Sequence, residues 1–109
     1  MRLKQNRLNT RKVCSFVVKK DDEGNKTVSY DYEHAREVKL ETWPAGGRLQ
    51  AEIYGERLNY ILNGLAEKSA EIAEKDGVCI DSEKVTHKVI SKKPYTDHIV
   101  LELEYVGNR

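Results

Sequence analysis

Apolar and polar residues alternate along most of this chain, and the alternation predicts short β-strands. Residues 27–32 alternate strictly, so that valine and tyrosine side chains share one face and polar side chains the other. A β-branched run at residues 13–19 precedes them. The polar cluster between the two runs, residues 21–25, ends in a Gly-Asn pair that favours a tight turn. We therefore predict a β-hairpin.

The same period-two pattern predicts several further strands. The clearest is residues 99–106, in which Glu102 and Glu104 alternate with apolar side chains and are expected to face water. The other predicted strands are residues 37–43, 78–80 and 85–91, with turns at 75–77 and 93–97.

One segment in the middle of the chain interrupts this pattern. An extended run ends at Pro44, because the residue before a proline avoids helical geometry. Residues 48–54 then predict a short amphipathic helix and residues 58–62 a strand. A turn signal at Asn63-Gly64 and a looser segment up to residue 74 would follow. The alternative is a single helix through most of this region, since residues 66–75 are rich in helix formers.

Together these elements predict a mainly β fold. We expect a small antiparallel β-barrel or sandwich of six to seven strands, with one short helix and long loops. A chain of 109 residues is long enough for one domain. We assign residues 1–12, which are basic and contain no acidic side chain, to a flexible arm, and residues 13–106 to the single β-rich domain.

Charge and hydropathy restrict the classes of partner. Charged residues make up 34% of the chain, yet the formal net charge is only +1, which argues against a dedicated nucleic-acid-binding protein. No apolar run approaches the roughly 18 residues of a membrane helix. The first residues also lack the apolar stretch of a signal peptide. We therefore expect no membrane partner and synthesis in the cytoplasm.

The sequence contains no recognisable catalytic or metal-binding motif. It has neither a glycine-rich phosphate loop nor a serine in a nucleophile-elbow context. Cys14 and Cys79 are predicted to be buried, reduced thiols, and the three histidines are widely scattered. The acidic run 21–23 lacks the ligand spacing of a calcium loop. We predict no enzymatic activity, no catalytic residues, no bound metal and no cofactor.

The segment PAGGRLQAEIYGERLNYIL, residues 44–62, resembles the middle of small head–tail joining proteins of tailed bacteriophages and prophages. The opening hairpin, the turn at 75–78 and the strands near 88–91 and 99–103 agree in kind, so that the resemblance extends over most of residues 13–106. It implies a small β-barrel with a helix and long loops. It does not extend to residues 1–12.

The resemblance also implies a role. Such proteins are non-enzymatic parts of the head–tail connector and act as head-closure, or stopper-type, proteins. They join the portal or adaptor to the tail, and they assemble as a ring that helps to retain DNA. The implied location is the virion, after synthesis in the cytoplasm of the host bacterium. Whether the isolated protein is a monomer, and whether it contacts DNA in the channel, are left open.

Under this hypothesis, loops and edges carry the protein contacts. The candidate segments are residues 21–26, 43–54 and 63–76. The candidate interface residues are Trp43, Arg48, Leu49, Tyr54, Arg57, Asp22 and Glu23. We expect Arg48 and Arg57 to pair with glutamates of a neighbouring subunit, with Tyr54 packed between them. A candidate arm that would contact DNA or a protein partner is formed by Arg2, Lys4, Arg7 and Arg11.

The alternative function is that of a small nucleic-acid-binding β-barrel. Tyrosines on one face of a barrel can stack on bases while nearby arginines follow the phosphate backbone. The near-neutral charge of the chain weighs against this alternative.

Overall fold

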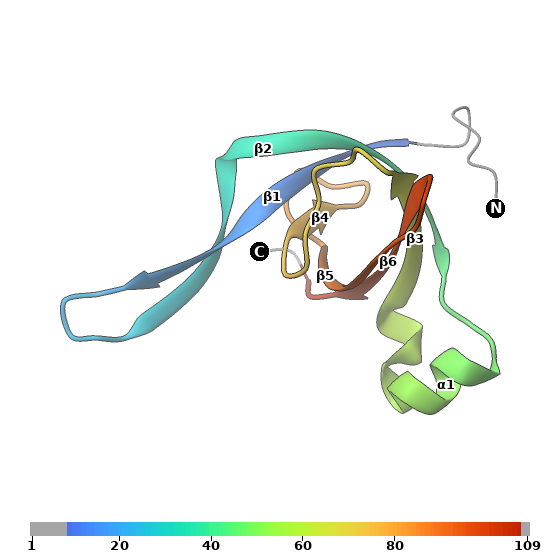
Figure 1. Cartoon of the computed structure of the whole chain (residues 1–109). Helices are drawn as coiled ribbons and strands as arrows, with labels where there is room; N and C mark the ends of the chain where they lie inside the picture. Colours follow the sequence, from blue (N-terminus) through green and yellow to red (C-terminus); the bar gives the residue numbers. More distant parts are fainter. Residues whose placement is uncertain (1–8, 108–109) are drawn as a thin grey trace.

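Six antiparallel β-strands form the body of the protein in a computed structural model, which describes residues 9–107 (Figure 1). The strands are β1 (Asn9–Lys20), β2 (Lys26–Pro44), β3 (Ile61–Glu67), β4 (Gly77–Cys79), β5 (His87–Pro94) and β6 (His98–Tyr105). A short helix, α1 (Arg48–Tyr54), and a 3-10 helix, η2 (Gly55–Tyr60), connect β2 to β3. None of the helices in the described part of the chain is long and apolar enough to cross a membrane.

The strands close into a barrel in the order β1-β2-β3-β6-β5-β4. The prediction of a mainly β, antiparallel fold is confirmed. The sequence left a barrel and a sandwich open, and the structure is a barrel. The final seam joins β1 to β4 through three residue pairs, which run from Lys12 opposite Cys79 to Cys14 opposite Gly77. Closure gives the barrel strands hydrogen-bonding neighbours on both sides, so that few strand edges are left unpaired.

Alternating residues of the strands fill the barrel. In β6, Ile99, Leu101 and Leu103 are buried, whereas Glu102 and Glu104 lie partly exposed on the outer face. The alternation in the sequence therefore predicts the inward face of this strand correctly. Full burial of an aliphatic side chain of this size stabilises the fold by about 1.5–3 kcal/mol.

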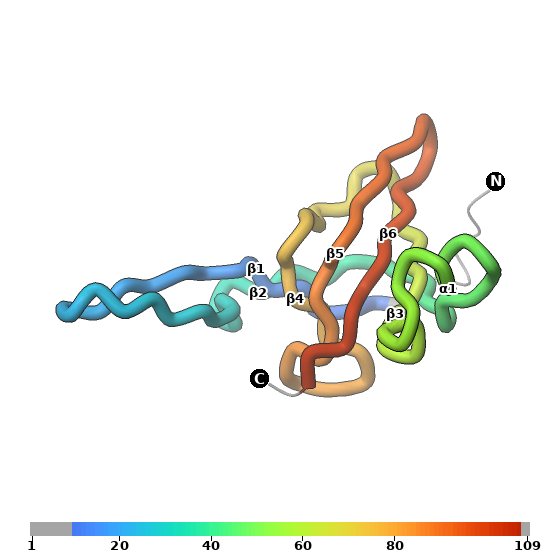
Figure 2. Tube along the Cα trace, turned by 90° about the horizontal axis from the view of Figure 1, so that it is seen from below, coloured from blue at the N-terminus to red at the C-terminus, as the bar shows by residue number. Residues whose placement is uncertain are grey.

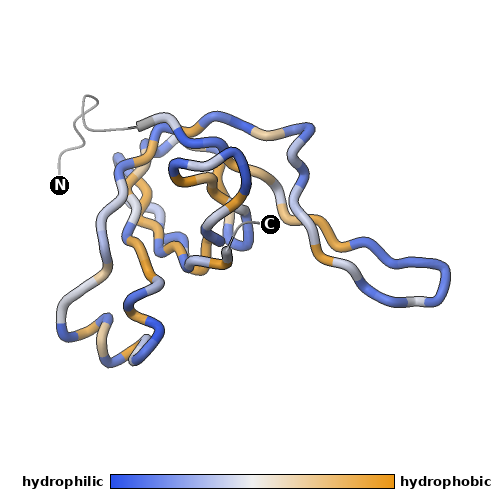
Figure 3. Tube along the Cα trace, turned by 180° about the vertical axis from the view of Figure 1, so that it is seen from behind, coloured by the Kyte–Doolittle hydropathy of each residue, from blue (hydrophilic) through white to orange (hydrophobic). Residues whose placement is uncertain are grey.

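β1 and β2 continue beyond the barrel as a two-stranded projection, residues 15–31, which we call the ribbon (Figures 1 and 2). The predicted hairpin is confirmed. Its tip is closed by a hydrogen bond from the Asp21 amide to the Asn25 carbonyl at 2.9 Å, and Gly24 has a positive φ of 84°. Hydrophobic positions extend along the ribbon from the barrel, and the tip is hydrophilic (Figure 3).

A large irregularity in register separates the ribbon from the barrel. Val13 pairs with Arg36, but Ser15 pairs with Asp31, so that residues 32–35 of β2 lie opposite Cys14 alone. Extra residues in one strand bend it and increase its twist. The strand predicted at residues 37–43 is therefore the second half of one long, bent β2.

The region between β2 and β3 differs from both predictions made for it. The predicted helix at 48–54 is present as α1, but the strand predicted at 58–62 is right only for its last two residues, because residues 55–60 form η2 and β3 begins at Ile61. The alternative of one continuous helix is also wrong. Gly55, with a φ of 56°, separates α1 from η2, and β3 follows from Ile61.

Asn63-Gly64, predicted as a turn, lies inside β3. A Cβ on Gly64 would lie 3.3 Å from both the Leu101 Cβ and the Leu40 Cδ1. Gly64 is therefore compatible with the strand because it lets two core leucines approach the backbone closely.

β1 begins earlier than the strand predicted from Val13. Residues 10–12 pair with 37–39 of β2, so that Arg11 belongs to the barrel and not to a terminal arm. The other members of the predicted arm, Arg2, Lys4 and Arg7, lie outside the described residues.

Candidate functional site

Most of the interface residues predicted from the sequence lie on two parts of the molecule, the α1–η2 segment and the tip of the ribbon. The two parts project in opposite directions from the barrel (Figures 1 and 2). Asp22 and Glu23 lie at the ribbon tip, and Arg48, Leu49, Tyr54 and Arg57 lie in the α1–η2 segment. Trp43 lies near the end of β2, where it pairs with Asn63 and is partly exposed.

Helix α1 stands on the outside of the barrel, and none of its residues is buried. Its first turn follows Gly47, which has a φ of 89° and accepts a hydrogen bond from the Ala51 amide. Leu49 and Ile53 are one helical turn apart, and 69% and 62% of their surfaces are exposed. A helix normally buries its apolar stripe, so this one lacks a cover in the single chain.

A polar network fixes α1 against the barrel. The Gln50 side-chain amide donates to the Asn63 Oδ1 at 2.6 Å and to the Glu102 Oε2 at 3.0 Å. The Gly46 amide donates to the Gln50 Oε1 at 3.1 Å. These contacts hold the helix beside β3 and β6 while its apolar stripe remains in solvent.

Arg57 has a partner within its own chain, whereas the pair predicted with a neighbouring subunit stays a prediction. Its guanidinium donates to both carboxylate oxygens of Glu104, at 2.7 and 2.8 Å, and lies 5.6 Å from the centre of the Tyr54 ring. The two hydrogen bonds hold the pKa of the Glu104 carboxyl below its ordinary value. Burial and the Glu102 carboxylate raise the pKa of Tyr54 to about 12.

Arg48 also has a partner in its own helix. Its Nε lies 3.5 Å from the Glu52 Oε1, and 94% of the Arg48 side chain is exposed. Such exposed pairs contribute little to stability. Arg48 therefore remains accessible to a partner, whereas Arg57 is held in the Glu104 pair.

The ribbon tip presents two exposed acidic side chains. The Asp21 carboxylate accepts hydrogen bonds from the Glu23 and Asn25 amides, at 3.0 and 2.8 Å, and so stabilises the turn. Asp22 and Glu23 form no ion pair with another described residue. They remain available to a partner.

Arg11 forms an ion pair with Asp81 at 2.8 Å, and most of the Arg11 side chain is buried. It is therefore held against the loop after β4. Of the four residues assigned to the predicted arm, it is the one that the structure describes.

The described residues contain no arrangement typical of an active site or metal centre. Within residues 9–107, no three His, Cys, Asp or Glu side chains are grouped as a metal ion requires. Cys14 and Cys79 are buried and unbridged, and burial raises the pKa of the Cys14 thiol to about 11. A thiol in this state is a poor nucleophile at neutral pH.

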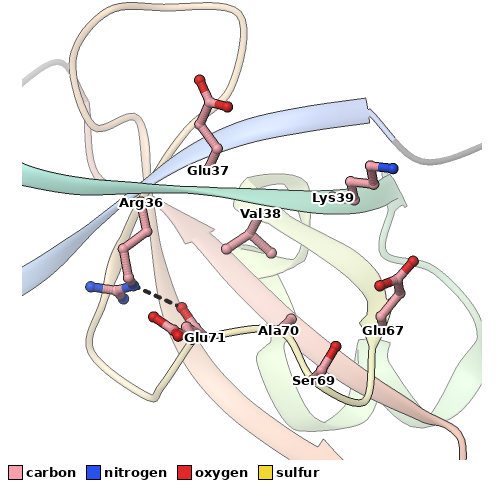
Figure 4. A pocket seen from close by; sticks show the side chains of 8 residues that line it. All are labelled: Arg36, Glu37, Val38, Lys39, Glu67, Ser69, Ala70 and Glu71. Carbon is pink, nitrogen blue, oxygen red and sulfur yellow. Dashed lines mark hydrogen bonds between the residues drawn. The ribbon is translucent and has the colours of Figure 1, made fainter.

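A hollow of about 430 Å³ lies between β2 and the loop after β3 (Figure 4). The Arg36 Nε donates to the Glu71 carbonyl at 2.9 Å, whereas Glu37 points away on the other side of β2 (Figure 4). The Arg36 Nη2 also binds the Asp76 carboxylate at 2.7 Å. Arg36 thus holds the loop after β3 against the barrel. The charged side chains that line the hollow do not converge on one point as a catalytic site requires.

Sequence reasoning missed three surface residues that the structure brings into view. Val28 was expected on the apolar face of the strand at 27–32 and Val18 in the apolar run before it, yet 51% of each is exposed, because the bulge carries this part of the hairpin away from the barrel. Lys93 was predicted to lie in a turn, but it lies in β5 and lines a groove with Leu49 and Ile53. The period-two pattern did contain the apolar ribbon face. It gave no signal that the face would be left uncovered.

Comparison of the chain with protein-family models, with curated proteins and with solved structures found no match.

Proposed function

We propose that this protein is a non-enzymatic structural component of the head–tail connector of a tailed bacteriophage or prophage. It would join the portal or adaptor to the tail, assemble as a ring of copies and help to retain the packaged DNA. It would be made in the cytoplasm of the host bacterium and function in the virion. The resemblance of residues 44–62 to head–tail joining proteins supports this proposal.

The observation that carries the proposal is the uncovered apolar surface at two projections of one small barrel. Leu49 and Ile53 on α1, and Val18 and Val28 on the ribbon, are each at least half exposed. Apolar surface left open on projecting elements is typical of proteins whose function is to contact other proteins. A rigid barrel that presents such projections suits assembly by fitting against neighbours.

The alternative, a nucleic-acid-binding barrel, has weaker support. Arg11 is held by Asp81, and the exposed tyrosines lie in separate parts of the fold, namely Tyr32 in β2, Tyr60 in η2, Tyr95 between β5 and β6, and Tyr105 in β6. Strongly salt-dependent binding of DNA by the purified protein would favour this alternative.

Deletion of the gene from the phage or prophage that encodes it tests the proposal. We expect filled heads that lose DNA and carry no tails, and we expect the normal gene supplied in trans to restore tailed particles. Electron microscopy of the particles gives the result. Normal tailed particles from the deletion would refute the connector role.

Substitution of single interface residues refines this test. Trp43→Ala and Tyr54→Ala should lower the yield of infectious particles more than Arg48→Ala does, because an aromatic anchor contributes more to an interface than an exposed charge. Plaque titres of the complemented deletion measure the difference. Normal titres for both aromatic variants would show that this part of the interface is misplaced.

A further inference from the structure

Both cysteines of the chain lie in the seam that closes the barrel. Cys14 of β1 and Cys79 of β4 each follow the central residue pair of the seam, in which Val13 lies opposite Val78. Successive residues of a strand point to opposite faces of the sheet. The two valines belong to the main core cluster, so both thiols point to the other face of the seam.

On that face the two thiols belong to one small buried cluster. Cys14, Cys79 and Val85 form the cluster, and Tyr30 packs against it. The two thiols also lie within hydrogen-bonding contact of each other. The fold thus brings together two thiols that are far apart in the sequence, which is the first requirement for a disulfide.

The register determines how far the strands must move to form a bond. The cysteines are diagonal neighbours, and the Cα atoms of a diagonal pair in a regular ladder are about 7–8 Å apart. A disulfide joins Cα atoms that are about 4.4–6.8 Å apart. Near Cys14 the ladder is irregular, because residues 32–35 of β2 lie opposite it, and β4 is only three residues long. A small shift of β4 toward β1 is therefore sufficient.

The seam is the least strongly paired part of the barrel wall. β4 is joined to β1 by three residue pairs and to β5 by two, whereas β3 and β6 share seven. Segments with few backbone hydrogen bonds open locally at a lower free energy than the whole fold. Such opening exposes the thiols to a small oxidant. It also removes the burial that raises the pKa of both thiols in the closed state.

We propose that Cys14 and Cys79 form a reversible disulfide that fastens β4 to β1. The oxidant is a low-molecular-weight disulfide of the glutathione class. The Cys79 thiolate attacks one sulfur atom of the oxidant and releases one small thiol, and the Cys14 thiolate then attacks the Cys79 sulfur and releases the second. The two protein thiols are oxidised, the oxidant is reduced, and the two protons leave on the small thiols. Cys79 reacts first because 4% of it is exposed, whereas Cys14 is completely buried.

The bond acts at the base of the ribbon. Cys14 is the residue of β1 directly before the ribbon, and Tyr30 of the ribbon packs against the cysteine cluster. A covalent seam therefore fixes the point at which the ribbon leaves the barrel. The bacterial cytoplasm keeps thiols reduced, so the bond forms after release from the cell. This timing rests on the proposed place in the virion, whereas the bond itself does not.

Equilibration of the purified full chain in glutathione buffers tests the disulfide. In oxidised glutathione the protein should lose both free thiols, and its mass should fall by that of two hydrogen atoms. Peptide mapping should find the link between Cys14 and Cys79, and excess reduced glutathione should restore both thiols. Thiols that stay free, glutathione adducts in place of the link, or linked dimers overturn the inference.

A variant with one thiol moved to the other face of the seam is the matched control. Cys79→Ala/Ile80→Cys keeps two thiols, but residue 80 packs against the main core cluster. Under the same conditions this variant should form no internal link. An internal link that forms as rapidly as in the unsubstituted chain overturns the inference, because closure would then not depend on the geometry of the seam.

Thermal denaturation provides a second test. The link joins two strands that are distant in the sequence, so it restricts the unfolded chain. The oxidised protein should therefore have an unfolding midpoint about 5–10 °C above that of the reduced protein. Cys14→Ala, which cannot form the link, should show no such rise in oxidised glutathione. A midpoint of the oxidised protein that is equal or lower overturns the inference, because the bond would then not fasten the native seam.

The connector role and the disulfide can fail separately. If the deletion removes tails but the thiols stay free in oxidised glutathione, the connector role stands and the disulfide is refuted. If the deletion leaves tails normal while the link forms and raises the midpoint, the disulfide stands and the connector role is refuted.

Discussion

Single residues determine how closely the parts of this barrel approach one another, and Gly77 is the tightest case. It lies where β4 meets both β1 and β5. A Cβ at this position would lie 2.6 Å from the Val85 Cγ2 and 2.8 Å from the Tyr30 Cδ1. Gly77 therefore lets the base of the ribbon pack against the barrel wall.

Gly77→Ala should destabilise the protein by about 1–3 kcal/mol, because the added methyl group overpacks a closed site. Gly46→Ala is the matched control, because a Cβ there meets no atom within 4 Å and the residue does not have a positive φ. Urea denaturation followed by circular dichroism measures both changes. Equal unfolding midpoints for Gly77→Ala and the unsubstituted protein would contradict the close packing.

The Arg57–Glu104 pair predicts a dependence of stability on pH. The pKa of Glu104 is lowered in the folded state, so its contribution is present above its unfolded pKa, near the ordinary value of 4.5, and is lost as the pH falls through the lower folded pKa. Glu104→Gln should therefore lower the unfolding midpoint at pH 7 and make little difference at strongly acidic pH. Urea titrations at several pH values test this. A deficit in the variant that is the same at every pH would show that the pair does not act through charge.

At the scale of secondary structure, the local sequence predicted the strands that depend on neighbouring residues. It missed the elements that depend on contacts between residues distant in the sequence. The alternation at residues 27–32 and 99–106 predicted the hairpin and β6 because one face of each is apolar. Residues 58–62 also alternate, yet the helical path started by α1 continues through η2. Asn63-Gly64 has turn chemistry, but packing against Leu40 and Leu101 keeps it in a strand.

The exposed surfaces of α1 and the ribbon were predictable only where they depend on the local sequence. Leu49 and Ile53, one turn apart in a short helix, are visible in the sequence, and so are the acidic residues of the ribbon tip. The pairing of β1 with β4 and the bulge opposite Cys14 depend on contacts distant in sequence. These two features decide which part of the hairpin leaves the barrel, and so which valines remain uncovered.

The ribbon should be separable from the fold of the barrel. Replacement of residues 17–29 by an Asn-Gly turn keeps the pair Phe16–Tyr30 and removes no residue of the main core cluster. We expect this shortened chain to fold with a similar unfolding midpoint but to lower the yield of infectious particles when it replaces the normal protein. Thermal denaturation and plaque titres of the complemented deletion test the two parts. An unfolded product would show that the barrel needs the ribbon.

At the scale of the whole molecule, the chain combines a closed barrel with two projections that it does not cover itself. The barrel core is built from aliphatic side chains of all six strands, so the body can remain rigid while its two ends make contacts. This division is compatible with the proposed role as a connector subunit held between copies of itself and adjoining proteins. The near-neutral net charge of +1 allows copies to approach without strong repulsion.

The most direct test of this account is a cryo-electron microscopy reconstruction of the neck of phage particles that encode this chain. The account predicts a ring of copies between the portal assembly and the tail, with the ribbon and α1 in contact with neighbouring subunits. Tailed, DNA-filled particles whose neck contains no density for this barrel would contradict it.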